Sequence, residues 1–146
     1  MNGLLFVDTN VLLYEWDPAD APKKRRAEEW MRALWASHRG RVSFQVLAEF
    51  YVTATQKLDP VLERAAARQY VRTLLAWEPL AIDAAVVDGA WRAQDQFRLS
   101  WWDALILAAA QRAGCRTLLS EDFQDGRSYD DVTVVNPFRV QPEAMS

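Results

Sequence analysis

The sequence predicts an α/β domain, built as a three-layer α/β/α sandwich around a mostly parallel sheet of about five strands. Three observations support this prediction. Short apolar runs of strand length alternate with segments of helical period along the chain. The first run, Leu4–Val7, is continuously apolar, as in strands that are buried on both faces. The 146 residues, 51% of them hydrophobic and 25% charged, have the size and composition of one globular domain.

The first half of the chain predicts two strands and three helices. The strand at residues 4–7 ends at Asp8-Thr9-Asn10, and a short helix follows at residues 11–15. Residues 20–38 have a clear helical period, which we expect to end at Gly40. Residues 41–44 are predicted as the second strand. The next helix is expected to bury four apolar side chains, namely Val46, Leu47, Phe50 and Ala54.

The second half continues the alternation. Asp59-Pro60 predicts a helix start, with Asp as the N-cap and Pro at the first helical position. Residues 80–82 are predicted as a third strand, followed by a helix capped by Asp83 that buries Trp91 among others. Ser100 opens a further helix that ends at Gly114. Strands at 116–120 and 132–135 flank a polar loop at 121–130. The domain is expected to span residues 1–138, with a frayed tail at 139–146.

Composition excludes several classes of protein. The net charge is −3, which counts mildly against nucleic-acid binding unless the charge is unevenly distributed. One cysteine, Cys115, excludes an intramolecular disulfide framework and a Cys-rich zinc site, and any Ser-His-Asp triad would depend on the single histidine, His38. No apolar run is long enough to span a membrane, and the first residues lack the pattern of a signal peptide. We therefore expect a cytoplasmic protein.

Four acidic residues stand where a parallel sheet binds ligands, beyond the carboxyl ends of its strands. Asp8 follows the first strand and Asp122 follows the fourth. Glu49 lies in the helix after the second strand, and Asp103 lies in the first turn of the helix that leads into the fourth. Each also has a purely structural explanation, since Asp103 completes a capping box with Ser100 and the others suit a cap, a turn or an exposed helix face. Taken singly, the structural explanation is favoured for each.

Five segments in order change this balance, because together they closely resemble the PIN-domain family, and more specifically its VapC-type toxins from toxin–antitoxin pairs. The resemblance spans residues 4–138. Its segments are Asp8-Thr9-Asn10-Val11-Leu12, Gln45-Val46-Leu47-Ala48-Glu49-Phe50-Tyr51, Ser100-Trp101-Trp102-Asp103-Ala104-Leu105-Ile106, Leu118-Leu119-Ser120-Glu121-Asp122-Phe123 and Val135-Asn136-Pro137-Phe138.

This resemblance implies a function and a set of site residues. PIN domains bind Mg²⁺ or Mn²⁺ in an acidic pocket and cut RNA, and VapC-type toxins are usually homodimers neutralised by a small antitoxin protein. By motif match, Asp8 would be the first metal ligand, and Glu49, Asp103 and Asp122 the other acids. Asn10 and Ser120 match positions that support such a site. The expected protein is thus a metal-dependent endoribonuclease, with RNA as substrate and an antitoxin as partner.

Electrostatics supports a metal in such a cluster independently. Two unit charges 4 Å apart interact by about 4 kcal/mol at an effective dielectric constant of 20. Clustered carboxylates therefore either raise their pKa values or hold a cation. Ligation by oxygen alone selects Mg²⁺ or Mn²⁺ over Zn²⁺. We expect in-line attack by a metal-activated water, leaving a 5′-phosphate and a 3′-hydroxyl. The number of ions, and whether Glu121 or Asp125 joins the site, stay open.

Three alternative functions fit parts of the sequence. The first is a PIN nuclease of RNA processing or decay, outside toxin–antitoxin systems. The second is an aspartyl-nucleophile phosphatase, which needs a second Asp where this chain has Asn10. The third is a degenerate PIN domain that binds without cleaving, although all four acidic positions are filled.

Aromatic and basic residues supply further candidates for RNA contacts. Of the seven tryptophans, Trp16, Trp101 and Trp102 flank the expected pocket, where one could stack on a base. The others fit the core or a dimer interface. The basic run at residues 23–26 and a stripe of arginines could track RNA phosphates or form solvated helix faces. That stripe consists of Arg64, Arg68 and Arg72.

Overall fold

Five strands form one sheet at the centre of the protein, which a computed structural model describes over residues 3–145. The strand order is β2-β1-β3-β5-β4. The first four of these strands are parallel, and β4 pairs antiparallel with β5 at one edge. The strands are β1 (Leu4–Val7), β2 (Gly40–Arg41), β3 (Cys115–Leu119), β4 (Ser128–Tyr129) and β5 (Val132–Val135).

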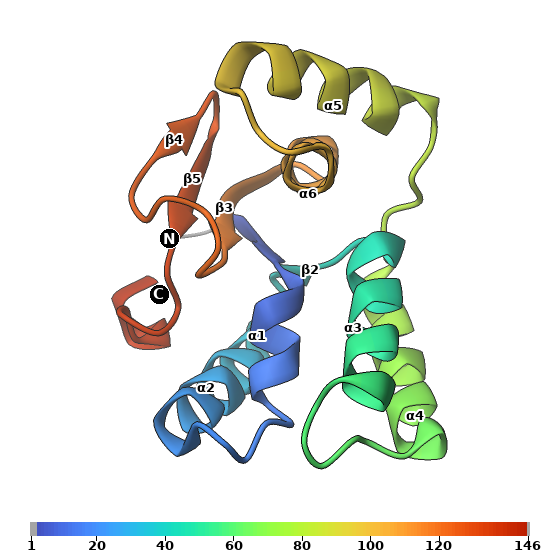
Figure 1. The fold of residues 1–146 in the computed structure, drawn as a ribbon. Helices are drawn as coiled ribbons and strands as arrows, with labels where there is room; N and C mark the ends of the chain where they lie inside the picture. Colours follow the sequence, from blue (N-terminus) through green and yellow to red (C-terminus); the bar gives the residue numbers. More distant parts are fainter. Residues whose placement is uncertain (1–2, 146) are drawn as a thin grey trace.

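Helices cover both faces of this sheet (Figure 1). α5 and α6 lie together on one side, whereas α1 and α2 lie on the other, and α3 and α4 stand side by side next to α1. This arrangement confirms the predicted α/β sandwich with a mostly parallel sheet. The helices are α1 (Thr9–Tyr14), α2 (Ala21–Ser37), α3 (Phe44–Gln56), α4 (Arg64–Leu74), α5 (Ala84–Phe97) and α6 (Trp101–Arg112), with short 3₁₀ helices η1 (Leu75–Trp77) and η2 (Pro142–Met145).

The core forms between the sheet and α6, the most completely buried helix. The apolar side chains of β1 and β3 face helices on both sides, which explains why their sequences are continuous apolar runs. Seven consecutive residues of α6, from Ala104 to Ala110, are buried. The small side chain of Ala108 lets α5 approach closely, since a Cβ added at Gly89 of α5 would lie 3.4 Å from the Cβ of Ala108.

Strand register positions the candidate site. Val7, the last residue of β1, pairs with Leu119, the last residue of β3. The next residues, Asp8 and Ser120, therefore emerge side by side at the carboxyl end of the sheet. The backbone N–H of Asp8 also donates to the carbonyl of Leu119 at 3.0 Å. The local sequence reinforces this placement, because Asp8 caps α1 while it leaves the strand.

Two predicted strands differ from the structure. The strand expected at residues 41–44 is shorter and earlier, because Ser43 instead caps α3 and Phe44 begins that helix. The strand expected at 80–82 is a single parallel bridge between Ser43 and Leu80. A strand that the sequence did not predict, β4, lies inside the expected polar loop. It forms a hairpin with β5 that turns at Asp130.

The helix predicted to begin at Asp59-Pro60 starts later. α4 begins at Arg64, preceded by Glu63. The connection from α3 instead forms a turn, in which the N–H of Leu62 donates to the carbonyl of Ala54 at 2.8 Å.

Other helix boundaries follow the prediction closely. The caps predicted at Asp83 and Ser100 are confirmed, as is the left-handed conformation of Gly114. α2 ends slightly before the expected Gly40, because His38 adopts the left-handed conformation and caps the helix.

Two expectations about burial are wrong. Trp91 is 55% exposed, because α5 buries the helical stripe of Val86, Ala90 and Ala93 and Trp91 points about 100° away from Ala90. The tail beyond Phe138 is not frayed over its described residues. The buried indole N–H of Trp30 donates to the carbonyls of Pro137 and Val140, both at 2.9 Å, and η2 follows.

Within residues 3–145, no helix is both long and apolar enough to cross a membrane.

Candidate active site

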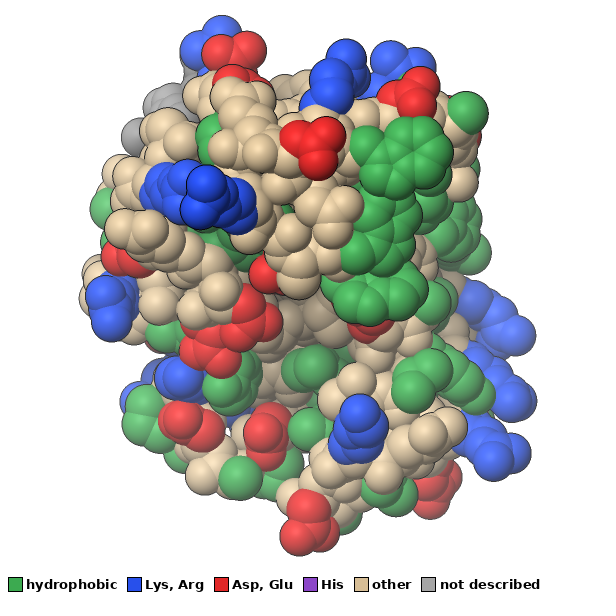
Figure 2. All heavy atoms as spheres, turned by 45° about the horizontal axis from the view of Figure 1, so that its top comes forward, with side chains coloured by type: hydrophobic (Ala, Val, Ile, Leu, Met, Phe, Trp, Pro, Cys, Tyr) green, Lys and Arg blue, Asp and Glu red, His purple; other side chains and the backbone are tan. Residues whose placement is uncertain are grey.

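The four predicted acidic residues line one open cleft at the carboxyl end of the sheet. The cleft has a volume of about 800 Å³ and is bounded by α1, α3, the start of α6 and the segment after β3. Figure 2 shows a hollow in this face of the molecule with acidic side chains on both sides. The four acids come from different parts of the chain. They are Asp8, Glu49, Asp103 and Asp122.

Asp8 lies at the centre of a hydrogen-bond network. Its side chain is 6% exposed, and Oδ2 accepts from the hydroxyl of Ser120 at 2.7 Å. Its Oδ1 accepts from the backbone N–H of Thr9 at 2.7 Å. The Ser120 hydroxyl oxygen in turn accepts from the backbone N–H of Asp122 at 3.0 Å. Ser120 thus joins the ends of β1 and β3 and fixes where both carboxylates lie.

Asn10 ties the same two carboxylates together through its amide. Its Nδ2 lies 3.1 Å from Asp122 Oδ2, 3.2 Å from Ser120 Oγ and 3.4 Å from Asp8 Oδ2. Its Oδ1 accepts from the backbone N–H of Glu121 at 3.3 Å. Asn10 therefore donates to acidic groups and holds no proton for a leaving group, which argues against the aspartyl-phosphatase alternative.

Glu49 and Asp103 reach the cleft from helices. The Thr9 hydroxyl donates to Glu49 Oε1 at 2.8 Å, and Gln45, one turn earlier on α3, places Nε2 3.4 Å from Glu49 Oε2. Asp103 lies in the first turn of α6, where its backbone N–H donates to the Ser100 hydroxyl at 3.2 Å. Because α6 leads directly into β3, its amino end lies at the same edge of the sheet as Asp8.

Burial and mutual repulsion raise the pKa of two of these acids, Asp8 and Asp103. Desolvation by burial, opposed by the hydrogen bonds from Ser120 and Thr9, raises the pKa of Asp8 to about 7. The neighbouring carboxylates of Asp122 and Glu49 contribute to this rise. Desolvation also raises the pKa of Asp103, again with contributions from Asp122 and Glu49. A cation in the cleft would relieve both effects.

Two further acids near the cleft form hydrogen bonds with groups outside it. Glu121 accepts from the Lys23 amine at 2.7 Å and from the Tyr14 hydroxyl at 2.8 Å. Asp125 accepts from the backbone N–H of Asn136 at 2.8 Å. Neither lines the cleft, so the structure gives no support for adding them to the site.

The donor chemistry of the cleft fits a hard divalent cation. Its ionisable donors are carboxylate oxygens, which suit Mg²⁺ or Mn²⁺. Across residues 3–145, however, no three acidic, histidine or cysteine side chains are close enough together to hold a metal ion by themselves. This arrangement suits Mg²⁺, which binds through one or two carboxylates and keeps several waters. Asp8 and Asp122, joined by Asn10, are the pair best placed for this role.

Several residues that line or organise the cleft were not predicted from the sequence. Thr9 and Gln45 orient Glu49, and Lys57 and Ile82 line the cleft. The spacing of four residues between Gln45 and Glu49 places both on one face of a helix. This signal in the sequence could have identified Gln45. Lys57 continues the same spacing of four along α3, through Thr53, so it too could have been found. Nothing local marks Ile82, which lies in the segment before α5.

The basic segments form ion pairs and ring contacts in the structure. Lys24 pairs with Glu28 at 3.0 Å, one helical turn away, and Lys23 binds Glu121. In the arginine stripe, the Arg68 guanidinium lies 5.9 Å from the centre of the Tyr51 ring and donates to its hydroxyl. The ion pairs of Lys23 and Lys24 show that the basic run at residues 23–26 mainly binds acidic groups of the protein itself.

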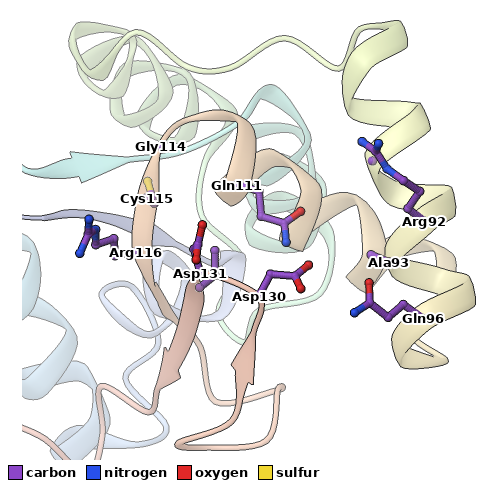
Figure 3. A pocket seen from close by; sticks show the side chains of 11 residues that line it. Arg92, Ala93, Gln96, Gln111, Gly114, Cys115, Arg116, Asp130 and Asp131 are labelled. Atoms are coloured by element: carbon purple, nitrogen blue, oxygen red, sulfur yellow. The ribbon is translucent and has the colours of Figure 1, made fainter.

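A second hollow lies at the opposite end of the sheet, at the start of β3 (Figure 3). Its volume is about 650 Å³. Arg92 and Gln96 face it from α5, Gln111 from α6, and Asp130 and Asp131 from the turn between β4 and β5.

The chain belongs to the PIN domain family, whose pattern matches residues 5–124. The fold also resembles several solved structures. FitAcB from Neisseria gonorrhoeae superposes with a TM-score of 0.70 at 18% identity, covering 94% of this chain and 100% of that one. A toxin–antitoxin complex from Klebsiella pneumoniae gives 0.60 at 24% identity, covering 92% and 97%.

A third similar structure is VapC20 from Mycobacterium tuberculosis, described as a toxin that cleaves the sarcin–ricin loop. It superposes with a TM-score of 0.57 at 21% identity, covering 78% of this chain and 86% of that one. At these identities the likeness shows the fold. A sequence comparison with curated proteins finds no significant match.

Proposed function

We propose that the protein is a metal-dependent endoribonuclease whose acidic centre consists of Asp8, Glu49, Asp103 and Asp122. The observation that carries this proposal is the environment of Asp8. Its buried carboxyl group, with a pKa raised to about 7, lies beside other acids in a cleft open to solvent. Asp8 stabilises the fold as the cap of α1, but a buried carboxyl group that is repelled by other acids costs stability until a cation or a proton compensates its charge.

The cleft residues would act together with Mg²⁺ or Mn²⁺. When bound, the ion lowers the pKa of a water molecule and offsets charge on the phosphate. Asp8 and Asp122 would hold it, with Ser120 and Asn10 keeping the two carboxylates in register. Thr9 and Gln45 orient Glu49 toward the same space, and Asp103 completes the acidic wall. Hydrolysis would leave a 5′-phosphate and a 3′-hydroxyl.

We further propose that this nuclease is the toxin of a type II toxin–antitoxin pair. Support comes from PIN family membership and from the toxin–antitoxin proteins among the similar structures. The expected partners are a small antitoxin protein, which would inhibit the toxin, and a second copy of the chain in a homodimer.

Digestion of mixed cellular RNA tests the proposed nuclease. Purified protein is incubated with RNA in Mn²⁺, beside Asp8→Asn and an EDTA control, and new 5′-phosphate ends are captured by ligation and sequenced. We expect discrete cuts with the wild type in Mn²⁺ and none in either control. Cuts of equal strength with Asp8→Asn would contradict the assignment of Asp8. A folded wild type that cuts nothing would favour the non-catalytic binding module.

A further inference from the structure

The acidic cleft has an apolar wall that metal binding does not explain. Three large apolar side chains that line it are exposed to solvent, namely Val52, Ile82 and Trp102. Figure 2 shows apolar side chains gathered in a band that runs down to the hollow beside its acidic groups. A ligand that fills this cleft must therefore offer both a charged group for the acidic centre and a flat apolar part for the wall.

Only one of the three tryptophans that flank the cleft in sequence lines it. The Trp16 ring packs edge-on against Tyr70, with centroids 5.3 Å apart, and does not line the cleft. Trp101 is half-buried against the core and contacts the Trp91 ring. Trp102 is 62% exposed, lines the cleft and immediately precedes Asp103.

The backbone holds Trp102 next to the acids. Its carbonyl oxygen lies 3.4 Å from Gln45 Nε2, which is also 3.4 Å from Glu49 Oε2. Gln45 therefore connects the start of α6 to α3 at the level of Glu49. Trp102 therefore lies at the same cleft as the acids, and it immediately precedes Asp103 in the chain.

We propose that Trp102 is a stacking platform for the base next to the scissile phosphate. This inference rests on the nuclease function proposed above. Bases in a duplex are stacked on their neighbours, so only a splayed base can cover an aromatic side chain. Stacking on such a ring tolerates any base, because every base has a π-face.

One basic side chain in the acidic cleft supports nucleic acid, rather than a protein, as the occupant of this wall. Lys57 lines the same cleft and is exposed, and across residues 3–145 it forms no ion pair. Its amine can contact a phosphate of the strand that passes Trp102. A flat ring, an amine and a metal-binding acidic centre match the base, the phosphate and the scissile bond of one strand.

Direct binding measurements test the platform separately from cleavage. The probe is a labelled single-stranded RNA of random sequence and about ten nucleotides, within the range of known single-strand site sizes. It is titrated in Ca²⁺, which binds carboxylates but is expected not to support cleavage. The proteins are the wild type, Trp102→Ala, Trp102→Phe and, as a matched exposed tryptophan outside the cleft, Trp91→Ala.

We expect Trp102→Ala to weaken binding about 5- to 150-fold, the range expected for loss of one stacked base. Trp102→Phe should retain most of the affinity, and Trp91→Ala should bind like the wild type. A probe with the same backbone but no bases should bind the wild type and Trp102→Ala equally. Thermal unfolding of each variant shows that the fold is retained.

The outcomes separate this inference from the function on which it rests. If the wild type cleaves RNA but Trp102→Ala binds and cleaves equally well, the platform is wrong and the nuclease stands. If Trp91→Ala weakens binding as much as Trp102→Ala, the effect belongs to the whole apolar band, which also overturns the platform. If the wild type neither binds the probe nor cleaves RNA, both proposals fail.

Discussion

Both ends of the sheet carry a hollow that contains charged groups, but the two hollows differ in how these groups are held. At the carboxyl end, Asp8 is buried and receives hydrogen bonds from Ser120 and Thr9. At the amino end, the charged residues are exposed and of mixed sign, and within residues 3–145 they form no ion pairs with one another. These residues are Arg92, Arg116, Asp130 and Asp131.

This difference shows that the presence of a hollow does not by itself identify a functional site. Water solvates the charges of the amino-end hollow, so its residues keep their places without any ligand. The carboxyl-end cleft instead holds a desolvated carboxyl group against other acids, which costs stability until a cation or protons arrive. Function is therefore expected at the end where the fold tolerates that cost.

The largest expected effect comes from neutralising Asp8. We expect Asp8→Asn to lower RNA cleavage in Mn²⁺ by at least about 100-fold, the upper end of the loss seen when groups supporting a metal ligand are removed. Asp131→Asn, which makes the same chemical change in the amino-end hollow, should leave the rate within about twofold, since it is a surface substitution. Initial rates with one RNA substrate measure both. Equal losses would contradict the distinction between the two ends.

Removal of the Ser120 hydroxyl should have the next largest effect. Ser120→Ala deletes the bond to Asp8 and leaves the N–H of Asp122 without its acceptor. We expect about a 10- to 100-fold loss of cleavage and a fall of about 1–3 kcal/mol in the free energy of unfolding. The control is Ser128→Ala on β4, whose exposed hydroxyl lies 2.9 Å from the hydroxyl of Thr133. A Ser120→Ala enzyme of normal rate would show that the network is not needed.

The metal-free protein should lose stability as pH rises, and Asp8 should cause part of the loss. The pKa of Asp8 is raised in the folded state to about 7, so the folded protein binds more protons than the unfolded chain between about pH 4 and 7. Its contribution is fully present below about pH 4 and is lost as the pH rises through about 7. The expected loss is on the order of a few kcal/mol.

Asp8→Asn isolates this contribution from other groups. Burial also raises the pKa of Glu15, which accepts from the Tyr70 hydroxyl, to about 7. That residue is present in both proteins, so the difference between their denaturation curves reports Asp8 alone. We expect the Asp8→Asn variant to lose less stability than the wild type from about pH 4 to about pH 7.5. At the higher pH, Mn²⁺ should restore the stability that the wild-type protein has lost. Parallel curves would contradict the raised pKa.

The smallest effect is expected at the arginines of the amino-end hollow. The double variant Arg92→Gln, Arg116→Gln should keep cleavage within about twofold and stability within about 0.5 kcal/mol of the wild type. Both side chains are exposed and solvated, so little is lost with their charge. A large loss of RNA cleavage in this variant would show that the substrate reaches beyond the carboxyl end.

Local signals explain most of what the sequence predicted correctly. The caps at Asp83 and Ser100 each receive a hydrogen bond from an N–H three residues ahead, so their patterns are visible in the chain itself. The apolar runs of β1 and β3 are equally local. Since Asp8 directly follows β1 and Asp122 comes soon after the end of β3, the carboxyl-end rule places both acids from the sequence alone.

The errors arose where distant parts of the chain decide the structure. Ser43 and Leu80 pair only because α3 and the segment before α5 meet, and the two residues of β4 are too short to show a period. The same holds within the site. Thr9 and Glu49 are 40 residues apart, and Gln45 lies 57 residues before its acceptor on Trp102. Such partners have no signature in a local window.

The central claim is that the carboxyl-end cleft holds the metal, and Mn²⁺ binding tests it most directly. Titration of the metal-free protein, followed by the electron paramagnetic resonance signal of unbound Mn²⁺, measures binding without any substrate. The account predicts that the wild type and Asp131→Asn bind Mn²⁺, whereas Asp8→Asn loses that binding. Undiminished binding by Asp8→Asn, or its loss in Asp131→Asn, would contradict the account.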